Sequence, residues 1–254
     1  MTAVAALKTF AKRHLPRGMN VGPAVVQLFL NDGRTTRIGL NNFPAFFAPS
    51  QAVEYRYRLR IFDEEGREAG HTSVELARYG SAEVNLNALF GGALPRFGIL
   101  AARIEPLQFF SLRDRHLGRI RPHVFALYAS EEMDSIGLVH PQTHLDAAAA
   151  PDRRWLSNLE IDPAVVERIE IFQINPGRIA VESEVFLQAE EGEILAKSAA
   201  RIPARGTRRA SFELSPYAGR KKAVSVGLQG LAAANGKPIL FLHFRDRSFT
   251  CCHA

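Results

Sequence analysis

Apolar and polar residues alternate along residues 52–62, whose sequence is AVEYRYRLRIF. Every second residue from the valine onward is apolar and the residues between are charged, which is the period-two pattern of a half-buried β-strand. Residues 180–187, AVESEVFL, alternate in the same way. Each segment runs into an acidic turn that ends in glycine, Gly66 in one case and Gly192 in the other, at an offset of 126. Glycine supplies the backbone freedom that a hairpin needs at this position.

Further apolar segments follow twice in the same order. The corresponding segments begin at Val84 and Phe212, at Phe97 and Ala223, and at His123 and Ile239. The segments SIGLVH, residues 135–140, and SFTCCH, residues 248–253, close the two series at an offset of 113. The shorter offset has a visible cause, because the loop PLQFFSLRDRHLGRIRP occurs only in the first series. Strands that stay in order while the offset changes by a whole loop are typical of a duplicated domain.

Short strands with turn signals roughly every 8 to 12 residues predict an all-β chain of antiparallel sandwiches. The first fifteen residues are the exception, because their apolar positions fall at helical spacing and predict a short N-terminal helix. Proline residues and a run of alanines mark a linker between the two series. The predicted parts are an N-terminal amphipathic segment, a first β-sandwich, a linker and a second β-sandwich, at residues 1–20, 21–145, 146–160 and 161–254.

The second series also carries a sequence likeness. FQINPGRIAVESEVFLQAEEGEIL followed by ARIPARGTRRASFEL resembles the immunoglobulin-like sandwich modules common in bacteria, in which an Asn-Pro turn, an acidic-Gly hairpin and a Pro-Ala-Gly turn recur. The first series departs from this pattern, because it has NNFPAFFAPSQ before its strand and lacks the Pro-Ala-Gly turn. The resemblance implies two tandem immunoglobulin-like sandwiches, which usually bind or space other molecules rather than catalyse, although fold alone does not define function.

Composition places the chain among ordinary globular proteins. Of its 254 residues, 46% are hydrophobic and 23% are charged, and no stretch approaches the ~20 apolar residues of a spanning helix. The two cysteines are adjacent, so no disulfide framework is expected, and the N-terminus lacks the apolar core of a signal peptide. These features predict a cytoplasmic protein. The formal net charge of +6 favours anionic partners.

The most specific basic feature is a row of three arginines, Arg56, Arg58 and Arg60, on one face of the predicted strand. Spaced roughly 7 Å apart, they would present forked donors to carboxylates, phosphates or sulfates. Glu182 and Glu184 occupy the places of the first two arginines in the second series. Three interpretations are open: the two faces meet within a chain or in a homo-oligomer, the arginines bind a soluble anion, or they form an ordinary solvated strand face.

The loop at residues 111–123 adds further basic groups to the first series. Its candidate binding residues are Arg113, Arg115, His116, Arg119 and Arg121. Two phenylalanines precede the loop, and such mixtures of aromatic and basic groups occur in proteins that bind single-stranded nucleic acid. The sequence has no Walker loop, no GxGxxG before a helix, no GxSxG and no HExxH.

The C-terminal Cys-Cys-His is open to two interpretations. On a strand, Cys251 shares a face with His253 while Cys252 points the other way, so we expect Cys251 to act as a small hydrophobe in a core. Alternatively, His140, His144, Cys251 and His253 form a zinc site, since imidazole and thiolate are zinc ligands.

The sequence therefore predicts a non-catalytic binding or assembly protein with no cofactor. Its expected partner is anionic, either an acidic protein surface, a polysaccharide or a nucleic acid. The alternative is a metal-binding protein or metal-dependent enzyme that uses the four zinc-type ligands above. A third expectation is weak association of the N-terminal segment with an anionic membrane, since that segment has basic residues and no acid.

Overall fold

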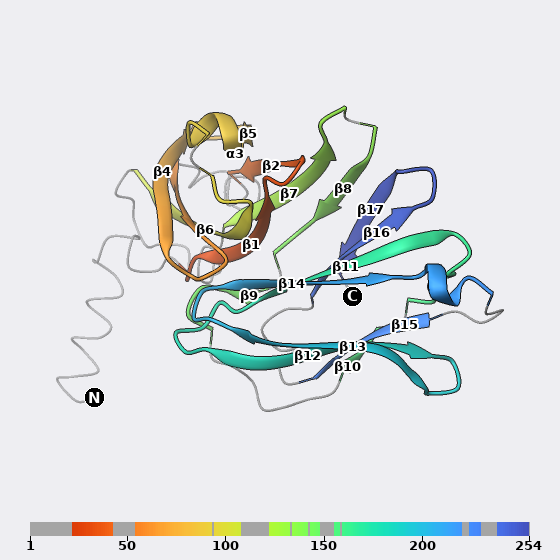
Figure 1. Cartoon of the computed structure of the whole chain (residues 1–254). Coiled ribbons are helices and arrows are strands. Elements are labelled where there is room, and N and C mark those ends of the chain that lie inside the picture. The colour runs from red at the N-terminus through yellow and green to blue at the C-terminus, as the bar shows by residue number, and fades with distance from the viewer. Residues whose placement is uncertain are drawn as a thin grey trace, which may run out of the picture.

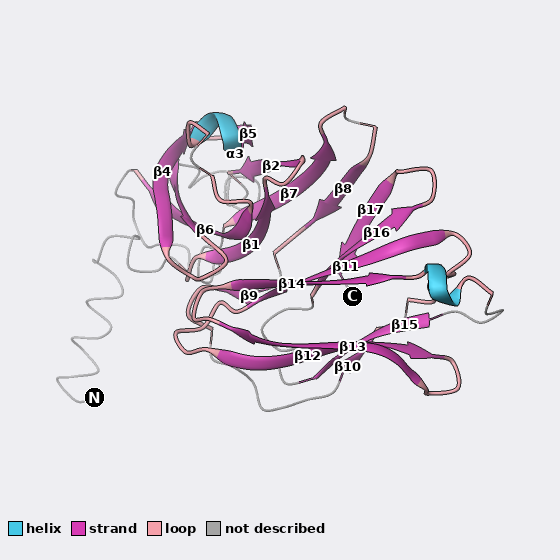
Figure 2. Cartoon of the chain, in the orientation of Figure 1, coloured by secondary structure: helices cyan, strands magenta, loops and turns pink. Residues whose placement is uncertain are grey.

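The computed structural model of this chain describes residues 22–42, 54–92, 94–107, 122–132, 134–141, 143–147, 155–157, 159–219, 224–229 and 238–253. The predicted N-terminal helix and amphipathic segment therefore lie outside the described residues. The regular secondary structure of the described residues is almost entirely β-strand, with the short helix α3 (Leu86–Leu89) and the 3-10 turn η3 (Ser215–Tyr217), as Figure 2 shows. The all-β prediction is confirmed. Within the described part of the chain, no helix has the length and apolar character that crossing a membrane requires.

The strands form four antiparallel sheets, two in each half of the chain (Figure 1). The first half has the sheet orders β4-β3-β6-β1-β9 and β5-β2-β7-β8. Its strands are β1 (Val25–Leu30), β2 (Arg34–Asn41), β3 (Tyr55–Phe62), β4 (Glu68–Leu76), β5 (Ser81–Asn85), β6 (Phe97–Pro106), β7 (His123–Ser130), β8 (Ile136–Val139) and β9 (Thr143–His144).

The second half has the sheet orders β10-β15-β12-β13 and β14-β11-β16-β17. Its strands are β10 (Trp155–Leu156), β11 (Val166–Ile174), β12 (Val181–Ala189), β13 (Ile194–Ile202), β14 (Thr207–Glu213), β15 (Val224–Gln229), β16 (Ile239–Phe244) and β17 (Phe249–His253). Strands β1 to β8 of the first half correspond in order to strands β10 to β17 of the second half. When each strand is replaced by its counterpart, the two sheet orders of the first half become those of the second half. Strand β9 is an additional edge strand of the first half.

The registers of the two halves correspond as well as their sheet orders. Gly39 on β2 pairs with Glu83 and Phe125, and Phe172 on β11 pairs with Arg209 and Ile239. These partners lie at the same positions on the corresponding strands. A residue in one half can therefore be assigned to its counterpart in the other.

One turn has the same hydrogen bonds in both halves. The backbone N–H of Asn42 donates to Gly80 O, and that of Asn175 donates to Gly206 O. Both asparagine side chains donate to carbonyls of the turn they face, Ala77 O at 3.0 Å in the first half and Pro203 O at 2.8 Å in the second. The first half was expected to lack the Pro-Ala-Gly turn. It lacks the Pro-Ala sequence, but Ala77 to Gly80 make the same turn because backbone and asparagine groups define it.

Alternation along the strands places one face of each sheet in a core. On β3, Tyr55, Tyr57, Leu59 and Ile61 are buried, as the sequence pattern predicts. They pack with residues of β2, β6 and β7 in a core between the two sheets of the first half. An equivalent core in the second half is lined by β11, β12, β14 and β15. Each half therefore has its own core between its two sheets.

A third core joins the two halves, and we call the region around it the junction. Leu28, Leu30 and Tyr128 of the first half pack there against Phe172 and Phe241 of the second. Figure 1 shows β8 beside β17, and β11 is buried on both faces because each half covers one of them. The apolar contact fixes the two halves relative to each other.

The segment predicted as a linker, residues 146–160, contributes to this arrangement. Its strand β10 pairs with β15 in the second half. Asp146 at its start forms ion pairs with Arg178 and Arg205, each at 2.8 Å. These described residues of the segment are bonded to the second half.

Candidate functional site

Apolar contacts, hydrogen bonds and ion pairs all occur at the junction, and a hairpin of the first half takes part in it. The turn between β3 and β4 docks on the turn between β13 and β14, where the backbone N–H of Thr207 donates to Glu64 O at 3.1 Å. Arg208 donates to the same carbonyl at 2.9 Å and forms an ion pair with Glu65 at 2.9 Å. A Cβ atom at Gly66 would lie only 1.9 Å from Ala204 O. The acidic-Gly hairpin of one half and the Pro-Ala-Gly turn of the other thus form a docking pair.

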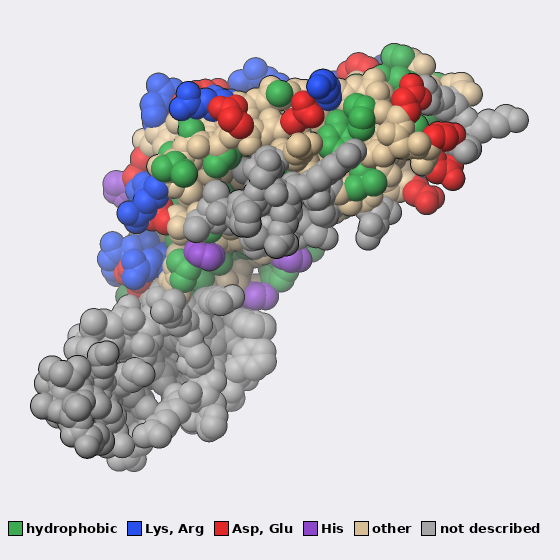
Figure 3. All heavy atoms as spheres, turned by 90° about the horizontal axis from the view of Figure 1, so that it is seen from below, with side chains coloured by type: hydrophobic (Ala, Val, Ile, Leu, Met, Phe, Trp, Pro, Cys, Tyr) green, Lys and Arg blue, Asp and Glu red, His purple; other side chains and the backbone are tan. Residues whose placement is uncertain are grey.

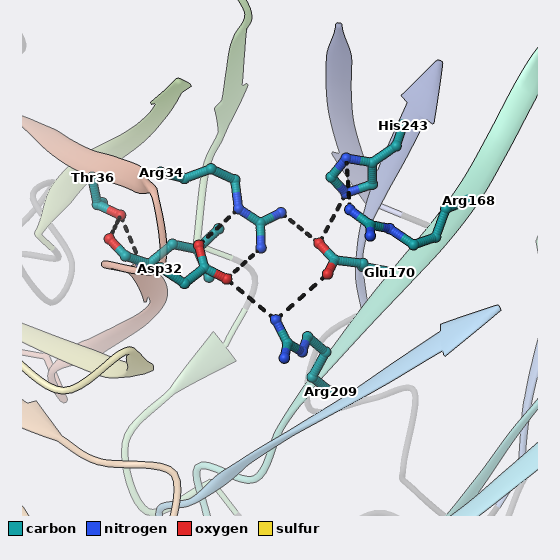
Figure 4. Close-up of polar contacts among 8 residues, drawn as sticks. Asp32, Arg34, Thr36, Arg168, Glu170, Arg209 and His243 are labelled. Carbon is teal, nitrogen blue, oxygen red and sulfur yellow. Dashed lines mark hydrogen bonds and ion pairs between the residues drawn. The ribbon is translucent and has the colours of Figure 1, made fainter. Parts of the chain in front are cut away.

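A buried group of charges also lies at the junction (Figure 4). The guanidinium of Arg34, at the start of β2, donates two hydrogen bonds to the Asp32 carboxylate at 2.9 and 2.6 Å. Its third contact, at 2.6 Å, is with Glu170 on β11 of the second half. The side chains of Asp32, Arg34 and Glu170 are 3%, 9% and 7% exposed. An ion pair so deeply buried can form only when the two halves are docked.

Basic residues of the second half complete this charge cluster. Arg209 on β14 lies 3.3 Å from Asp32 and 3.5 Å from Glu170. His243 Nε2 lies 2.9 Å from the Glu170 carboxylate, and Arg168 lies 3.4 Å from the other ring nitrogen of His243. We name the group of Asp32, Arg34, Glu170, Arg209 and His243 the junction charge cluster. Each buried carboxylate therefore has at least two cationic or hydrogen-bonding partners, which buried charges require.

Aromatic rings surround the cluster and limit its contact with water. The Arg34 guanidinium carbon lies 4.7 Å from the ring centre of Phe241 and 5.6 Å from that of Phe172, within the range of cation–π attraction. Burial alone would raise the pKa of Glu170, but the His243 hydrogen bond and the Arg34 charge lower the pKa to about 2. Glu170 is therefore a fixed anion near neutral pH and is poorly suited to proton transfer.

The predicted arginine row lies on the outer face of the sheet that contains β3. Each arginine contacts a carboxylate of a neighbouring strand: Arg56 contacts Glu75 at 2.5 Å, Arg58 contacts Glu105 at 2.7 Å, and Arg60 contacts Glu68. Figure 3 likewise shows basic and acidic side chains next to one another on the face that it draws. A soluble anion would have to displace these carboxylates to bind all three arginines.

The reversed charges of the second half have the same explanation within the chain. Arg56 pairs in register with Glu75, and at the corresponding positions Glu182 pairs with Arg201. Both halves therefore have an ion pair at this position, but the arginine and the glutamate lie on opposite strands in the two halves. Arg201 lies 3.8 Å from Glu182. Glu184 likewise lies 3.5 Å from Lys197. The sequence pattern shows that glutamates replace arginines on one strand. It does not show that the neighbouring strand carries the matching opposite charges.

The basic loop predicted to bind an anion is only described at its edge. Arg113, Arg115, His116, Arg119 and Arg121 lie outside the described residues. A hollow of about 550 Å³ lies over Arg56, Arg58, Arg60 and His71 on the described outer face. Both basic features belong to the first half.

The predicted cysteine geometry is confirmed, although the surroundings of Cys251 differ from those expected. Cys251 is buried in the junction core, whereas Cys252 packs against the core of the second half and is partly exposed. A Cβ atom at Gly137 would lie 2.1 Å from the Cys251 sulfur, so β8 covers this thiol directly. Burial raises the pKa of Cys251 to about 12, which makes it a weak nucleophile near neutral pH.

The candidate zinc ligands are only partly brought together. The rings of His140 and His253 lie 5.1 Å apart, and His140 and His144 line a hollow of about 530 Å³ together with His123. Cys251 points instead into the junction core. Among the described residues, no group of three or more His, Cys, Asp or Glu side chains is arranged to hold a metal ion.

The sequence offered no clear signal for the junction charge cluster. Glu170 lies between Ile169 and Ile171 and so has the alternation of a solvated strand residue. Its burial becomes evident only when the other half covers that face of β11.

No protein-family model matches the sequence, and no curated protein matches it. Solved structures with some likeness include a β-glucuronidase from glycoside hydrolase family 2, with 10% identity and a TM-score of 0.21, covering 94% of this chain and 25% of that one. A second is Bacteroides uniformis β-glucuronidase 2, with 11% identity and a TM-score of 0.23, covering 91% and 26%. A third is a glycosyl hydrolase family 2 member from Bacteroides cellulosilyticus, with 8% identity and a TM-score of 0.22, covering 89% and 25%. This chain spans about a quarter of their length, and at these TM-scores the likeness carries no argument.

Proposed function

We propose that this protein is a non-catalytic binding or assembly protein built from two duplicated, immunoglobulin-like β-sandwiches that the junction locks into one rigid body. The observation that carries the proposal is the junction itself, where the Arg34–Glu170 ion pair is buried between the halves at 2.6 Å. A junction of this kind holds the outward faces of the two sandwiches at a fixed angle, as a scaffold for partners requires.

Corresponding details of the two halves support duplication as their origin. The sheet orders correspond, the Asn42 and Asn175 turns have the same hydrogen bonds, and the Arg56–Glu75 pair has a charge-reversed counterpart in Glu182–Arg201. Duplicated sandwiches would each retain an outer sheet face, and such faces and their loops are where sandwiches usually bind partners.

The state of the titratable groups also favours binding over catalysis. Glu170, Arg34 and Arg209 are engaged in the junction, and burial keeps the pKa of the Cys251 thiol high. Groups of this kind stabilise structure rather than transfer protons or attack substrates.

The anionic partner remains part of the proposal, and the basic loop at residues 111–123 is its principal site. The arginine row contributes less, because Glu75, Glu105 and Glu68 already neutralise it. Loop arginines that make phosphate or sulfate contacts would give binding that weakens steeply with salt, through release of counterions.

A salt-titrated binding assay with single-stranded DNA and with dextran sulfate tests this proposal. We expect the wild-type protein to bind at low salt, and expect binding to be lost when Arg113, Arg115, Arg119 and Arg121 are all changed to Glu. The matched variant changes Arg56, Arg58 and Arg60 to Glu, and we expect it to retain most of the binding. Equal binding by both variants and the wild type, or no binding of either polymer, would refute the anionic partner.

A further inference from the structure

The two halves differ in whether the outer face of one sheet is covered. In the second half, the outer face of sheet β14-β11-β16-β17 is covered at the junction by the first half. The first half has the corresponding sheet, β5-β2-β7-β8, and among the described residues its outer face is left uncovered at β8. Ile136 is 48% exposed there and Leu138 is 61% exposed.

Residues on the open face match those that form the junction. Leu127 pairs with Leu138 in the first half, and at the same positions Phe241 pairs with Cys251, both of which lie in the junction core. Phe125 and Ile136 correspond in the same way to Ile239 and Phe249. We name the group of Phe125, Leu127, Ile136 and Leu138 the open face.

Charges on the open face also correspond to those of the junction, with their signs exchanged. Glu170 and Arg209 of the junction charge cluster correspond to Arg37 and Glu83, which form an ion pair at 2.9 Å. At the junction, Glu170 receives Arg34 from the first half. If the open face makes a contact like the junction, Arg37 takes the place of Glu170. Its partner would then be an acidic residue in the second half, at the position that Arg34 has in the first half.

The second half presents such a residue. Glu167 lies three residues before Glu170, as Arg34 lies three residues before Arg37, and it is exposed at the register shift near the start of β11. Val165 lies five residues before Glu170, as Asp32 lies five residues before Arg37, and is 52% exposed. Leu242 and Phe244 on the adjoining strand are only partly buried. We name the group of Val165, Glu167, Leu242 and Phe244 the open end.

We propose that the open face of one copy of this chain binds the open end of another copy, so that chains assemble head to tail in the manner of the junction. The contact pairs apolar residues of the open face with Val165, Leu242 and Phe244, and pairs Arg37 with Glu167. It is heterologous, so it generates rings or filaments rather than a two-fold dimer. The inference rests on the assembly role proposed above and names its partner.

Sedimentation velocity of the full-length protein over a concentration series, without any ligand, tests the contact. We expect the mean mass to rise above that of the monomer with concentration. Leu138→Lys should weaken association about tenfold or more, because it places a charge in an apolar contact. The control is Ile179→Lys, which alters an apolar side chain 69% exposed on a turn of the second half and should leave association unchanged.

Charge reversal and mixing identify the partner surface. Arg37→Glu and Glu167→Arg should each weaken association, and the double variant should restore it. Leu138→Lys and Val165→Lys chains should each remain monomeric alone, yet form dimers and nothing larger when mixed, because each keeps one intact surface.

Other occupants of the open face give different results. A monomeric wild type at every concentration overturns the proposal, as does an association that Leu138→Lys leaves unchanged. Two-fold contact between open faces predicts that Val165→Lys has no effect, which also refutes the head-to-tail contact. Loss of polymer binding with self-association intact would refute only the anionic partner.

Discussion

At the scale of single residues, the protein contains two kinds of ion pair that contribute very differently. The Arg56–Glu75 pair lies on the surface, with the Glu75 side chain 55% exposed, whereas Glu170 is 7% exposed and has cationic partners from both halves. Surface pairs typically contribute about 0 to 1 kcal/mol, but removing one member of a buried pair costs about 3 to 5 kcal/mol.

We therefore expect Glu170→Gln to lower the free energy of unfolding at pH 7 by about 3 to 5 kcal/mol, and Glu75→Gln by about 1 kcal/mol or less. Urea denaturation of both variants measures the difference. Glu170 has a pKa lowered from 4.5 to about 2 in the folded protein, so its charge stabilises the fold above pH 4.5 and this contribution is lost as the pH falls towards 2. The gap between wild type and Glu170→Gln should close over that range, and a gap that stays constant would contradict this account of Glu170.

The two adjacent cysteines should differ in reactivity. Cys251 is covered by β8 in the junction core, whereas Cys252 is partly exposed. We expect a thiol-specific reagent to modify Cys252 in the native protein faster than Cys251, with mass spectrometry of peptides as the measurement. Denatured protein provides the control, because both thiols should then react alike. Faster labelling of Cys251 in the native state would mean that the register of β17 is wrong.

At the scale of elements, the sequence pattern predicted strands and their buried faces, but not which faces are buried by the other half. Alternation in residues 55–62 predicts the buried face of β3 correctly, because a half-buried strand needs only its own sheet partner and core. The same rule fails for β11, where Glu170 has the position of a solvated residue and is buried by the other half. The charge reversal at Glu182 was visible in the sequence, but its meaning required the pairing with Arg201. Local pattern therefore predicts strands and faces, whereas contacts between the halves depend on tertiary packing.

The hairpins after β3 and β12 allow a matched test of docking. Gly66 and Gly192 both have positive φ, 79° and 88°, so alanine at either position incurs backbone strain of roughly 1 to 2 kcal/mol. Only Gly66 faces a backbone carbonyl of the other half, since a Cβ atom there would lie 1.9 Å from Ala204 O. We expect Gly66→Ala to cost about 1 to 3 kcal/mol more than Gly192→Ala in the free energy of unfolding, because the extra methyl group overpacks the contact. Equal costs would show that the hairpin does not dock.

At the scale of the whole molecule, direct contacts join the two halves. An apolar core, a docked hairpin and a buried charge cluster all join residues that are far apart in sequence, such as Arg34 and Glu170. The sequence predicted two units and a linker, and nothing in its pattern indicated that the units share a core. The proposed binding and assembly both depend on the two halves being held in a fixed arrangement.

Differential scanning calorimetry of the full-length protein tests this claim most directly. Since the halves share a core, we expect a single unfolding transition whose calorimetric enthalpy equals the van't Hoff enthalpy. Glu170→Gln should broaden or split this transition, because it weakens the contact between the halves. Two resolved transitions in the wild-type protein, each with its own enthalpy and unaffected by Glu170→Gln, would contradict the account.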